Sequence, residues 1–471
     1  MRINNNMSAV ITNNKLLGTE GSLSDVMEKL SSGFSINHAS DNPSGIAIAG
    51  KMQAQIEGLD QASTNGSDGI SVLQTAEGAL NEVTEMIQRM RELSVQAANG
   101  TNSDTDRESI QKEIDSLLEE IDRVAATTEF NTINLLDGSL DCRTYAEHAT
   151  RIQTSNNVPA GIYALKISSA SMQATASAAD GLFGDVDSEA LEESGVITIN
   201  GYGIELSAGM SRETVYGMLR DACEKGAATI SDDEEPFTIS SMKYGANAEL
   251  KIDFSSVAFA EALGFSAEET DDGATISTTG VDAKVKLYKE DDEDVDSLFG
   301  TQATTKYDGN HIIVTDVGGF EFSFLAEAGY TGDITFNVTD IGSMTLHIGA
   351  NEGQSMKVRI ASISTELMYI DDLNVTRMDG PDDAMLALDD ALSYITSVRS
   401  QIGAYENRLE HTTRSLDATE ENMTSAISRI EDADMATTMV EYTKLNVLEQ
   451  AGVSALAQAN ELPQLALQLL Q

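Results

Sequence analysis

Residues 382–461 decide the fold, and they read DDAMLALDDALSYITSVRSQIGAYENRLEHTTRSLDATEENMTSAISRIEDADMATTMVEYTKLNVLEQAGVSALAQANE. Pro381 precedes this stretch and Pro463 follows it, with no proline between them. Apolar residues recur at every seventh position: Leu388, Ile395, Ile402, Leu409, Leu416, Met423 and Ile430. This spacing forms one apolar seam along a helix and is typical of a coiled coil. Because so narrow a seam cannot be buried alone, the stretch requires partner helices.

In a coiled coil, a second row of apolar residues flanks such a seam, and here that row is incomplete. Leu392 and Ile427 fit it. Four positions carry polar side chains instead: Arg399, Glu406, Thr413 and Glu420.

Composition excludes several classes of partner. The chain has 471 residues, enough for several domains, and a formal charge of -48, which repels nucleic acid and anionic lipid. A hydrophobic content of 41% argues against a disordered chain. Residues 1–6 lack the apolar core of a cleaved signal peptide, and no apolar run is long enough to span a bilayer. These features favour the cytoplasm or an export route that reads no such peptide.

The sequence contains no constellation typical of an enzyme, a cofactor site or a metal site. Its five histidines stand alone, and the nucleotide-binding and hydrolase motifs are missing. Cys142 and Cys223 form either one disulfide or two unrelated buried thiols. The acidic runs 232–235 and 291–294 are interpreted as solvated loops, with weak calcium binding as the alternative. We therefore expect no enzyme and no cofactor.

Partner helices are available in the first 130 residues. Residues 1–37 have a helical pattern interrupted by glycines, and 40–45 form a turn cluster. A second helix is expected over 46–98, with apolar residues every seventh position and Gly66 at one missing step. Thr105 and Glu108 resemble a capping box that opens a third helix. The seam of that helix is Ile110, Ile114, Leu117, Ile121 and Val124. Two of the expected helices precede the middle of the chain and one follows it, and this arrangement predicts a small antiparallel bundle.

Between about 140 and 375 the helical period gives way to short alternating runs. These runs predict a β-rich insertion, with one or two modules. The expected strands are 162–167, 196–200, 285–287, 312–315 and 320–324. After Glu441 a stripe at three- and four-residue spacing begins, and half of its members are small. Small residues let helix backbones approach closely, and an exposed stripe of this kind would be an aggregation liability in a monomer.

Several segments are too specific for a generic coiled coil. LSSGFSIN (30–37), GISVLQTAEGAL (69–80) and QRMRELSVQ (88–96) resemble the N-terminal part of bacterial flagellin. RSQIGA (399–404), SRIEDAD (428–434) and LAQAN (456–460) resemble its C-terminal part. Residues 195–265 are similar to an insertion module of flagellins and hook-associated proteins, and LHIGANEGQ (346–354) is similar to the family's returning hairpin.

The resemblance implies an α+β multidomain fold. Both termini would build a long antiparallel coiled-coil bundle around an inserted β-rich outer region. The expected domains are an N-terminal inner arm (1–44), the first part of the bundle (45–140), the β-rich surface insertion (141–343), the hairpin return with the second part of the bundle (344–435), and a C-terminal inner arm (436–471).

The resemblance also implies a function and partners. The chain would polymerise with itself into the flagellar filament for swimming motility, outside the cell. It would leave through the flagellar type III apparatus without a cleaved signal peptide. Further implied partners are an export chaperone at the C-terminal arm, the filament cap and the hook-junction proteins.

Two sets of site residues follow from the resemblance. The polymerisation contacts would lie on the terminal arms, at Ile3, Met7, Val10, Leu23, Met27, Leu30, Leu445, Leu448, Leu456, Leu462 and Leu469. The flagellin-sensing Toll-like receptor would contact the monomer at Arg89, Leu93 and Glu113. Arg89 lies about 200° from Ile87 on the helix, so it should face away from the seam. An ordinary solvated helix face is the alternative to a receptor site.

Two other functions share the helical arms. A hook-junction or cap protein would have termini that match those proteins better, which these do not. A filament subunit with an enzymatic insertion would need a metal or nucleophile constellation within 140–345, and the sequence has none.

Overall fold

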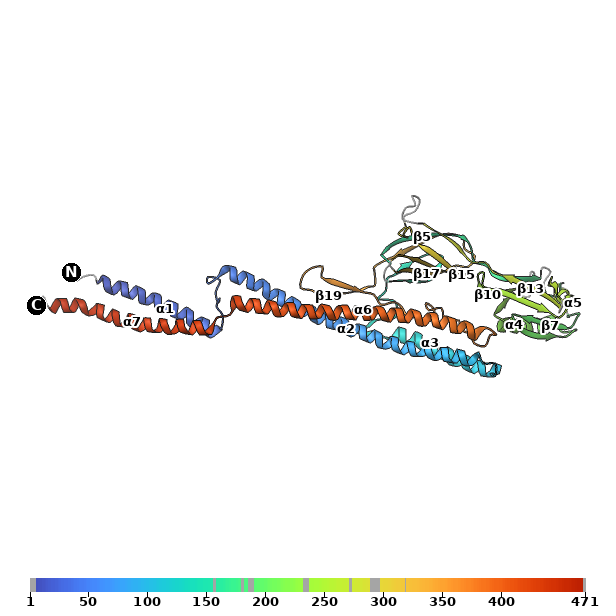
Figure 1. The fold of residues 1–471 in the computed structure, drawn as a ribbon, viewed down its shortest axis with the longest axis horizontal. Helices are drawn as coiled ribbons and strands as arrows, with labels where there is room; N and C mark the ends of the chain where they lie inside the picture. Colours follow the sequence, from blue (N-terminus) through green and yellow to red (C-terminus); the bar gives the residue numbers. More distant parts are fainter. Residues whose placement is uncertain are drawn as a thin grey trace. The chain divides into compact units, whose positions relative to one another are not determined.

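The structure, a computed structural model, describes residues 6–155, 158–178, 182–184, 190–231, 237–270, 273–288, 297–317 and 319–468. The chain divides into two compact units. Figure 1 shows its helices and strands, coloured along the sequence. The first comprises Met1–Ile70, Leu346–Met356 and Asn407–Gln471, and the second comprises Ser71–Thr345 and Lys357–Glu406.

The first unit pairs the two ends of the chain. Helix α1 (Met7–Ser32) follows the N-cap Asn6 and ends at Gly33, whose φ of +80° is a left-handed conformation that suits glycine. It runs without a break through the glycines at 18 and 21, so the predicted interruption was wrong. Helix α7 (Met435–Gln468) continues past Pro463, which the sequence analysis placed beyond the helical stretch.

Two longer helices also pair in an antiparallel manner. Helix α2 (Pro43–Ala97) opens with proline at its first position, where a missing N–H costs nothing, and helix α6 spans Gly380–Glu431. In the first unit the Ser63 hydroxyl donates to Asp417 at 2.7 Å. Gly66 lies against Thr413, and a Cβ at position 66 would be 2.5 Å from the Thr413 methyl group. Glycine at the missing step of the seam therefore permits close approach of α6.

The second unit adds a third helix to this pair. Helix α3 (Asp104–Thr127) is joined to α2 by Arg89 and Glu113 at 2.8 Å, while α2 is joined to α6 by Arg91 and Asp389 at 2.6 Å. The predicted bundle of three helices is confirmed. Its capping box was assigned to the wrong residues, because Ser103 is the N-cap and pairs reciprocally with Asp106. The buried residues of α3 are Ile110, Ile114, Leu118, Ile121 and Ala125.

Burial along the seam of α6 follows the number of helices that cover it. Leu388, Ile395 and Ile402 are fully buried in the second unit, where three helices pack together. In the first unit Leu409 is still buried, but Leu416 and the seam residues after it are only half-buried. The first unit therefore leaves part of the seam uncovered within one chain.

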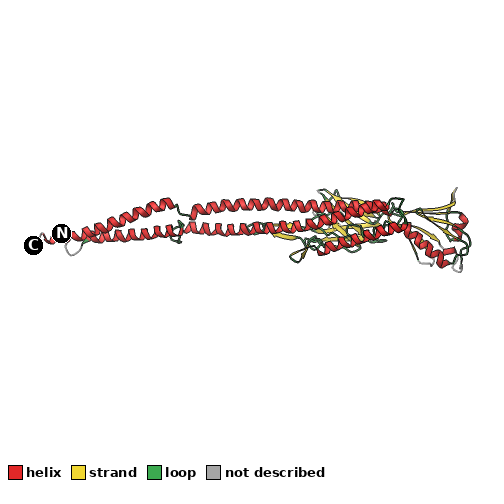
Figure 2. Cartoon of the chain, turned by 90° about the horizontal axis from the view of Figure 1, so that it is seen from below, coloured by secondary structure: helices red, strands yellow, loops and turns green. Residues whose placement is uncertain are grey.

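In the first unit, the break between α1 and α2 lies beside the break between α6 and α7 (Figure 2). Phe34, between α1 and α2, forms an antiparallel bridge with Asp432, between α6 and α7. Ser35 N–H donates to Glu431 O at 2.5 Å, and Ala433 N–H donates to Gly33 O at 2.9 Å. The stretch 382–461 is thus two helices rather than one.

Short hairpins connect the helices to the insertion. Strands β1 (Glu129–Phe130) and β2 (Ile133–Asn134) follow α3. Strands β19 (Met344–His347) and β20 (Ser355–Val358) form the predicted return hairpin.

One part of the insertion, made of residues from both of its ends, is a sandwich module of two four-stranded antiparallel sheets. One sheet has the order β14-β5-β18-β3 and the other β15-β16-β17-β4. The strands are β3 (Thr144–Tyr145), β4 (Ala149–Thr154), β5 (Gly161–Ser169), β14 (Lys284–Leu287), β15 (Thr304–Asp308), β16 (His311–Asp316), β17 (Phe320–Ala326) and β18 (Gly332–Val338). Aromatic side chains fill the space between the sheets, and the Phe322 and Phe336 rings lie 4.8 Å apart.

The other part, which lies between β5 and β14 in the sequence, is an α/β module with its own core. A five-stranded sheet (β12-β13-β11-β7-β8) and a three-stranded sheet (β6-β10-β9) pack with two helices and a single turn, η1 (Leu182–Gly184). The elements are β6 (Gln173–Ala178), β7 (Gly195–Ile199), β8 (Tyr202–Leu206), α4 (Arg212–Lys225), β9 (Ala228–Ile230), β10 (Phe237–Tyr244), β11 (Glu249–Phe254), α5 (Val257–Ala262), β12 (Glu268–Thr270) and β13 (Gly273–Thr279). The core includes Ala174 and Ala274, so the module is wider than the expected 195–265.

The expectations for strands are confirmed, and the question about cysteines is answered. All five predicted strands exist, and the insertion has two cores. Cys142 and Cys223 are free thiols, and burial raises the pKa of Cys223 to about 12. Both acidic runs, 232–235 and 291–294, lie outside the described residues.

Candidate assembly surface and receptor face

Helices α1 and α7 form an antiparallel pair with few buried residues. The Asn6 side chain donates to Ala459 O at 2.8 Å, and Leu16 packs against Gly452, where an added Cβ would be 3.1 Å away. Only Leu16, Val26 and Ala459 are buried among the described side chains of the pair. The small residues of α7 therefore bring the two backbones close together, as the stripe predicts.

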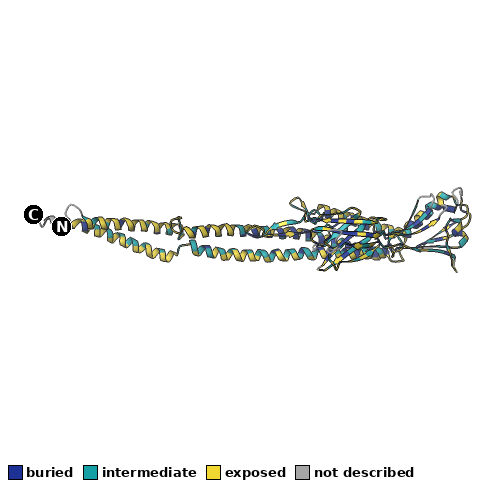
Figure 3. Cartoon of the chain, turned by 90° about the horizontal axis from the view of Figure 1, so that it is seen from above, coloured by how far each residue is buried: buried dark blue, intermediate teal, exposed yellow. Residues whose placement is uncertain are grey.

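The same pair leaves large apolar side chains in solvent. Exposed and half-buried residues dominate both helices (Figure 3). The exposed apolar residues of α1 are Met7, Val10, Ile11, Leu17 and Met27, and those of α7 are Met435, Met439, Val440, Val447, Leu448 and Val453. Val440 is 70% exposed and Met7 is 62% exposed. Apolar side chains at this density are typical of a surface that another protein covers. We call these eleven residues the arm surface.

The predicted polymerisation residues divide into three groups. Met7, Val10, Met27 and Leu448 belong to the arm surface. Leu23, Leu30, Leu445 and Leu456 are half-buried. Ile3 and Leu469 lie outside the described residues, as does the side chain of Leu462. The helical stripe found in the sequence thus contains residues that face α1 as well as residues that face solvent.

Sequence reasoning missed the most exposed valines of α7. Val440, Val447 and Val453 are 70%, 60% and 52% exposed. The sequence does show these valines, as apolar residues that lie outside the small-residue stripe.

The candidate receptor face contains an ion pair and one buried leucine. Arg89 donates from Nε and Nη2 to Glu113 at 3.0 and 2.8 Å, and both side chains are half-exposed. Hydrogen bonding to Glu113 raises the pKa of Arg89 above its usual value. Leu93 is only 2% exposed, so it packs inside the bundle and is not accessible in the folded monomer. The accessible part of the predicted face is therefore Arg89 with Glu113.

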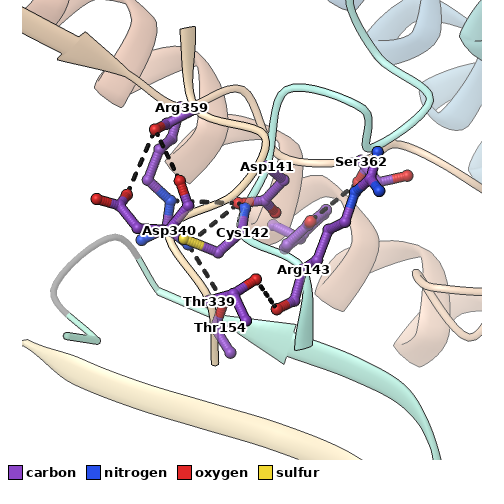
Figure 4. Close-up of polar contacts among 10 residues, drawn as sticks. Asp141, Cys142, Arg143, Thr154, Thr339, Asp340, Arg359 and Ser362 are labelled. Carbon is purple, nitrogen blue, oxygen red and sulfur yellow. Dashed lines mark hydrogen bonds and ion pairs between the residues drawn. The ribbon is translucent and has the colours of Figure 1, made fainter. Parts of the chain in front are cut away.

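A buried ion pair fixes the point where the insertion joins the helices (Figure 4). The Arg359 guanidinium donates to Asp141 at 3.1 Å, and Arg359 is 8% exposed. The backbone N–H of Cys142 also donates to the Asp141 carboxylate, at 2.7 Å. Burial raises the pKa of Asp141, and Arg359 opposes this shift. No sequence pattern predicted this pair, since its members are 218 residues apart.

The described part of the chain contains no cluster of metal-binding side chains. Within the same residues, no helix is long and apolar enough to cross a membrane. The exposed apolar side chains of α1 and α7 are typical of the class of proteins that associate through their helical termini.

Comparison with known proteins agrees with this class. The family models "Bacterial flagellin N-terminal helical region" and "Bacterial flagellin C-terminal helical region" match residues 3–141 and 385–470. A flagellin of Clostridium tyrobutyricum is 33% identical over 461 residues, covering 98% of this chain and 99% of the relative. Flagellin A of Vibrio anguillarum is 31% identical over 469 residues, covering 100% and 99%. The solved structure of FliC from Burkholderia pseudomallei is 19% identical, with a TM-score of 0.25 over 72% of this chain and 99% of that one, and adds no weight.

The chain belongs to the bacterial flagellin family. Flagellins are structural subunits of the flagellar filament and not enzymes, and this chain is a subunit of that kind.

Proposed function

We propose that the chain polymerises into a helical filament through the arm surface. The supporting observation is the row of exposed apolar side chains on α1 and α7, which a two-helix pair cannot bury by itself. Each CH₂ group removed from water contributes about 0.8 kcal/mol, so covering these side chains is a large driving force. Subunits stacked along their arms would cover them and form the inner core of the filament, with the bundle in a second shell and the β modules outside.

The same proposal includes the route and the partners. The subunit is exported through the flagellar type III apparatus without a cleaved signal peptide and functions outside the cell. An export chaperone covers the C-terminal arm before export, and the cap and hook-junction proteins contact the two ends of the filament. The exposed face of α7 supports the chaperone part, because unassembled apolar residues aggregate unless they are covered.

Polymerisation of the purified full chain, followed by electron microscopy, tests the proposal directly. Regular filaments are the expected result. Amorphous aggregates or a stable monomer at high concentration would contradict it.

We expect the insertion to be dispensable for assembly. A deletion of 144–338 can be closed with two glycines, because Thr339 N–H already donates to Arg143 O at 3.0 Å. The shortened chain should form thinner filaments at a similar critical concentration, since the arm surface is unchanged. The measurement is electron microscopy beside circular dichroism. A deletion protein that keeps its helical signal but never polymerises would show that the β modules take part in assembly.

We further infer that the flagellin-sensing Toll-like receptor binds the monomer at Arg89 and Glu113. The supporting feature is a half-exposed arginine held in a fixed position by a carboxylate. Arginine at the centre of an interface is a frequent hot spot. Arg89→Ala should therefore weaken binding of the receptor ectodomain at least about tenfold.

Arg91→Ala is the matched control for this variant. Arg91 lies on the same helix, is paired with Asp389 at 2.6 Å and points about 200° away. It should leave the affinity unchanged. Equal receptor affinities for the unchanged protein, Arg89→Ala and Arg91→Ala would mean that Arg89 belongs to an ordinary solvated face.

A further inference from the structure

Tyr369 lies in the segment between β20 and α6 and contacts the sandwich module. Its hydroxyl donates to Arg151 O of β4 at 3.2 Å. The Arg151 guanidinium lies 5.4 Å from the centre of the Tyr369 ring. Both residues have a positive φ, +58° for Tyr369 and +51° for Arg151. Such conformations are costly for residues other than glycine and persist where surrounding contacts hold them.

Further contacts join β4 to the same segment. Arg151 donates from both terminal nitrogens to the Asp371 carboxylate, at 2.8 and 2.7 Å. The Gln153 amide donates to Leu367 O. Met368 and Ile370, which flank Tyr369, are buried. Residues Leu367–Asp371 are thus the docking segment of the sandwich module.

His311 of β16 packs against the Tyr369 ring in this joint. The two ring centres are 4.5 Å apart. The His311 Nε2 atom is buried, and it has no hydrogen-bond partner in the described structure. A protonated imidazole would carry an N–H without an acceptor there, and an unmade buried hydrogen bond costs about 1–3 kcal/mol.

The charged groups around His311 come from several elements. Asp308 and Lys306 lie on β15, and Asp390 lies on α6. The guanidinium of Arg151 lies against the same tyrosine ring from β4. Burial lowers the pKa of His311 below its usual value and Lys306 acts in the same direction, while Asp308 and Asp390 oppose them.

We propose that His311 is an acid-sensitive latch, and that its protonation releases the sandwich module from the docking segment. This inference concerns the folded subunit and does not depend on polymerisation. A histidine whose pKa is lower in the docked state stabilises docking fully above its free value of about 6.5. That contribution is lost as the pH falls below this value, because the released state takes up a proton that the docked state does not. One proton changes the equilibrium by at most about tenfold per pH unit.

Cleavage after Glu366 by a glutamate-specific protease measures the release. Glu366 lies next to the docking segment, and its side chain is 70% exposed. The rate in the full chain, divided by the rate in a free peptide of residues 362–371, follows the open population when opening is fast. Between pH 6.5 and 5.5 this ratio should rise several-fold, and up to about tenfold, in the unchanged protein.

His311→Phe keeps a ring against Tyr369 but cannot titrate, so its ratio should stay flat. His411→Gln removes an exposed histidine and should behave like the unchanged protein. An equal rise in His311→Phe, or a flat ratio in the unchanged protein, would overturn the proposal. If His311→Phe folds poorly, the imidazole proton signals of the unchanged protein decide. His311 should titrate below the value of about 6.5 of a free histidine, and titration at or above that value would refute the latch.

Discussion

Deletion of residues 435–471 should abolish filament formation and leave the second unit folded. The deletion removes α7 as a whole, since this helix begins at Met435. Helix α1 then loses its antiparallel partner, and Leu16 and Val26 become exposed. Because the second unit contains no residue beyond Glu406, its three-helix core is unaffected. Sedimentation and electron microscopy measure assembly, and the near-ultraviolet tyrosine signal reports on the second unit.

A point variant makes this test sharper. Val440 is 70% exposed in the monomer, so Val440→Asp should not change the stability of the monomer. An unpaired carboxylate covered by a neighbouring subunit costs several kcal/mol, and 3 kcal/mol corresponds to about a 150-fold rise in critical concentration. Val440→Leu keeps an apolar side chain and should assemble normally. Normal filaments from Val440→Asp would show that this side of α7 remains in solvent.

The sequence predicted the helices well because their apolar period is strong, and it failed where two helices have to be aligned. The weak flanking row of α6 is an example. Thr413 packs on Gly66, Glu406 accepts from Gln74 at 2.7 Å, and Arg399 pairs with Glu77 at 3.6 Å. These residues fit the interface through partners on α2. Periodicity within one helix does not contain the register between two helices.

The burial of Leu93 has a related reason. A single seam through Ile87 correctly placed Arg89 outside the core. Helix α2 packs against two helices in the second unit, α3 on the Arg89 side and α6 on the Arg91 side. Its buried face is therefore wider than one seam and includes Met90 and Leu93.

Short sequence patterns predicted strands reliably where hydrophobic side chains alternate, and they predicted helix ends less well. The strands of the sandwich module alternate buried and exposed residues, as in β18, and were found from that pattern. The break between α6 and α7 contains neither proline nor glycine. It is stabilised by Asp434, whose carboxylate accepts from the N–H groups of Ala436 and Thr437 at 2.9 and 3.2 Å. In so acidic a sequence, several positions could form a short capping motif of this kind. The contact between Ala433 and Gly33 selects this one.

The second large effect is expected at the junction of the insertion and the helices. Arg359→Met should destabilise the second unit by about 3 kcal/mol, because it leaves the Asp141 carboxylate buried without its partner. Arg123→Met is the matched control, since Arg123 pairs with Glu120 at the exposed surface and its loss should leave the stability nearly unchanged. Urea unfolding followed through the near-ultraviolet tyrosine signal measures both variants. A loss in Arg359→Met as small as that of the control would mean that water replaces the guanidinium.

The pH dependence of that loss identifies its cause. Burial already raises the pKa of Asp141, and removal of Arg359 takes away the interaction that opposes this shift. A carboxyl group with a raised pKa binds a proton more readily in the folded state than in the unfolded state, so the folded state gains stability as the pH falls towards that pKa. The deficit of Arg359→Met should therefore be smaller at pH 5 than at pH 7.5. In the double variant Arg359→Met with Asp141→Asn no charge is left, and both the deficit and its pH dependence should largely disappear. A deficit that stays constant with pH and persists in the double variant would show that the packing of the Arg359 side chain, and not the ion pair, stabilises the junction.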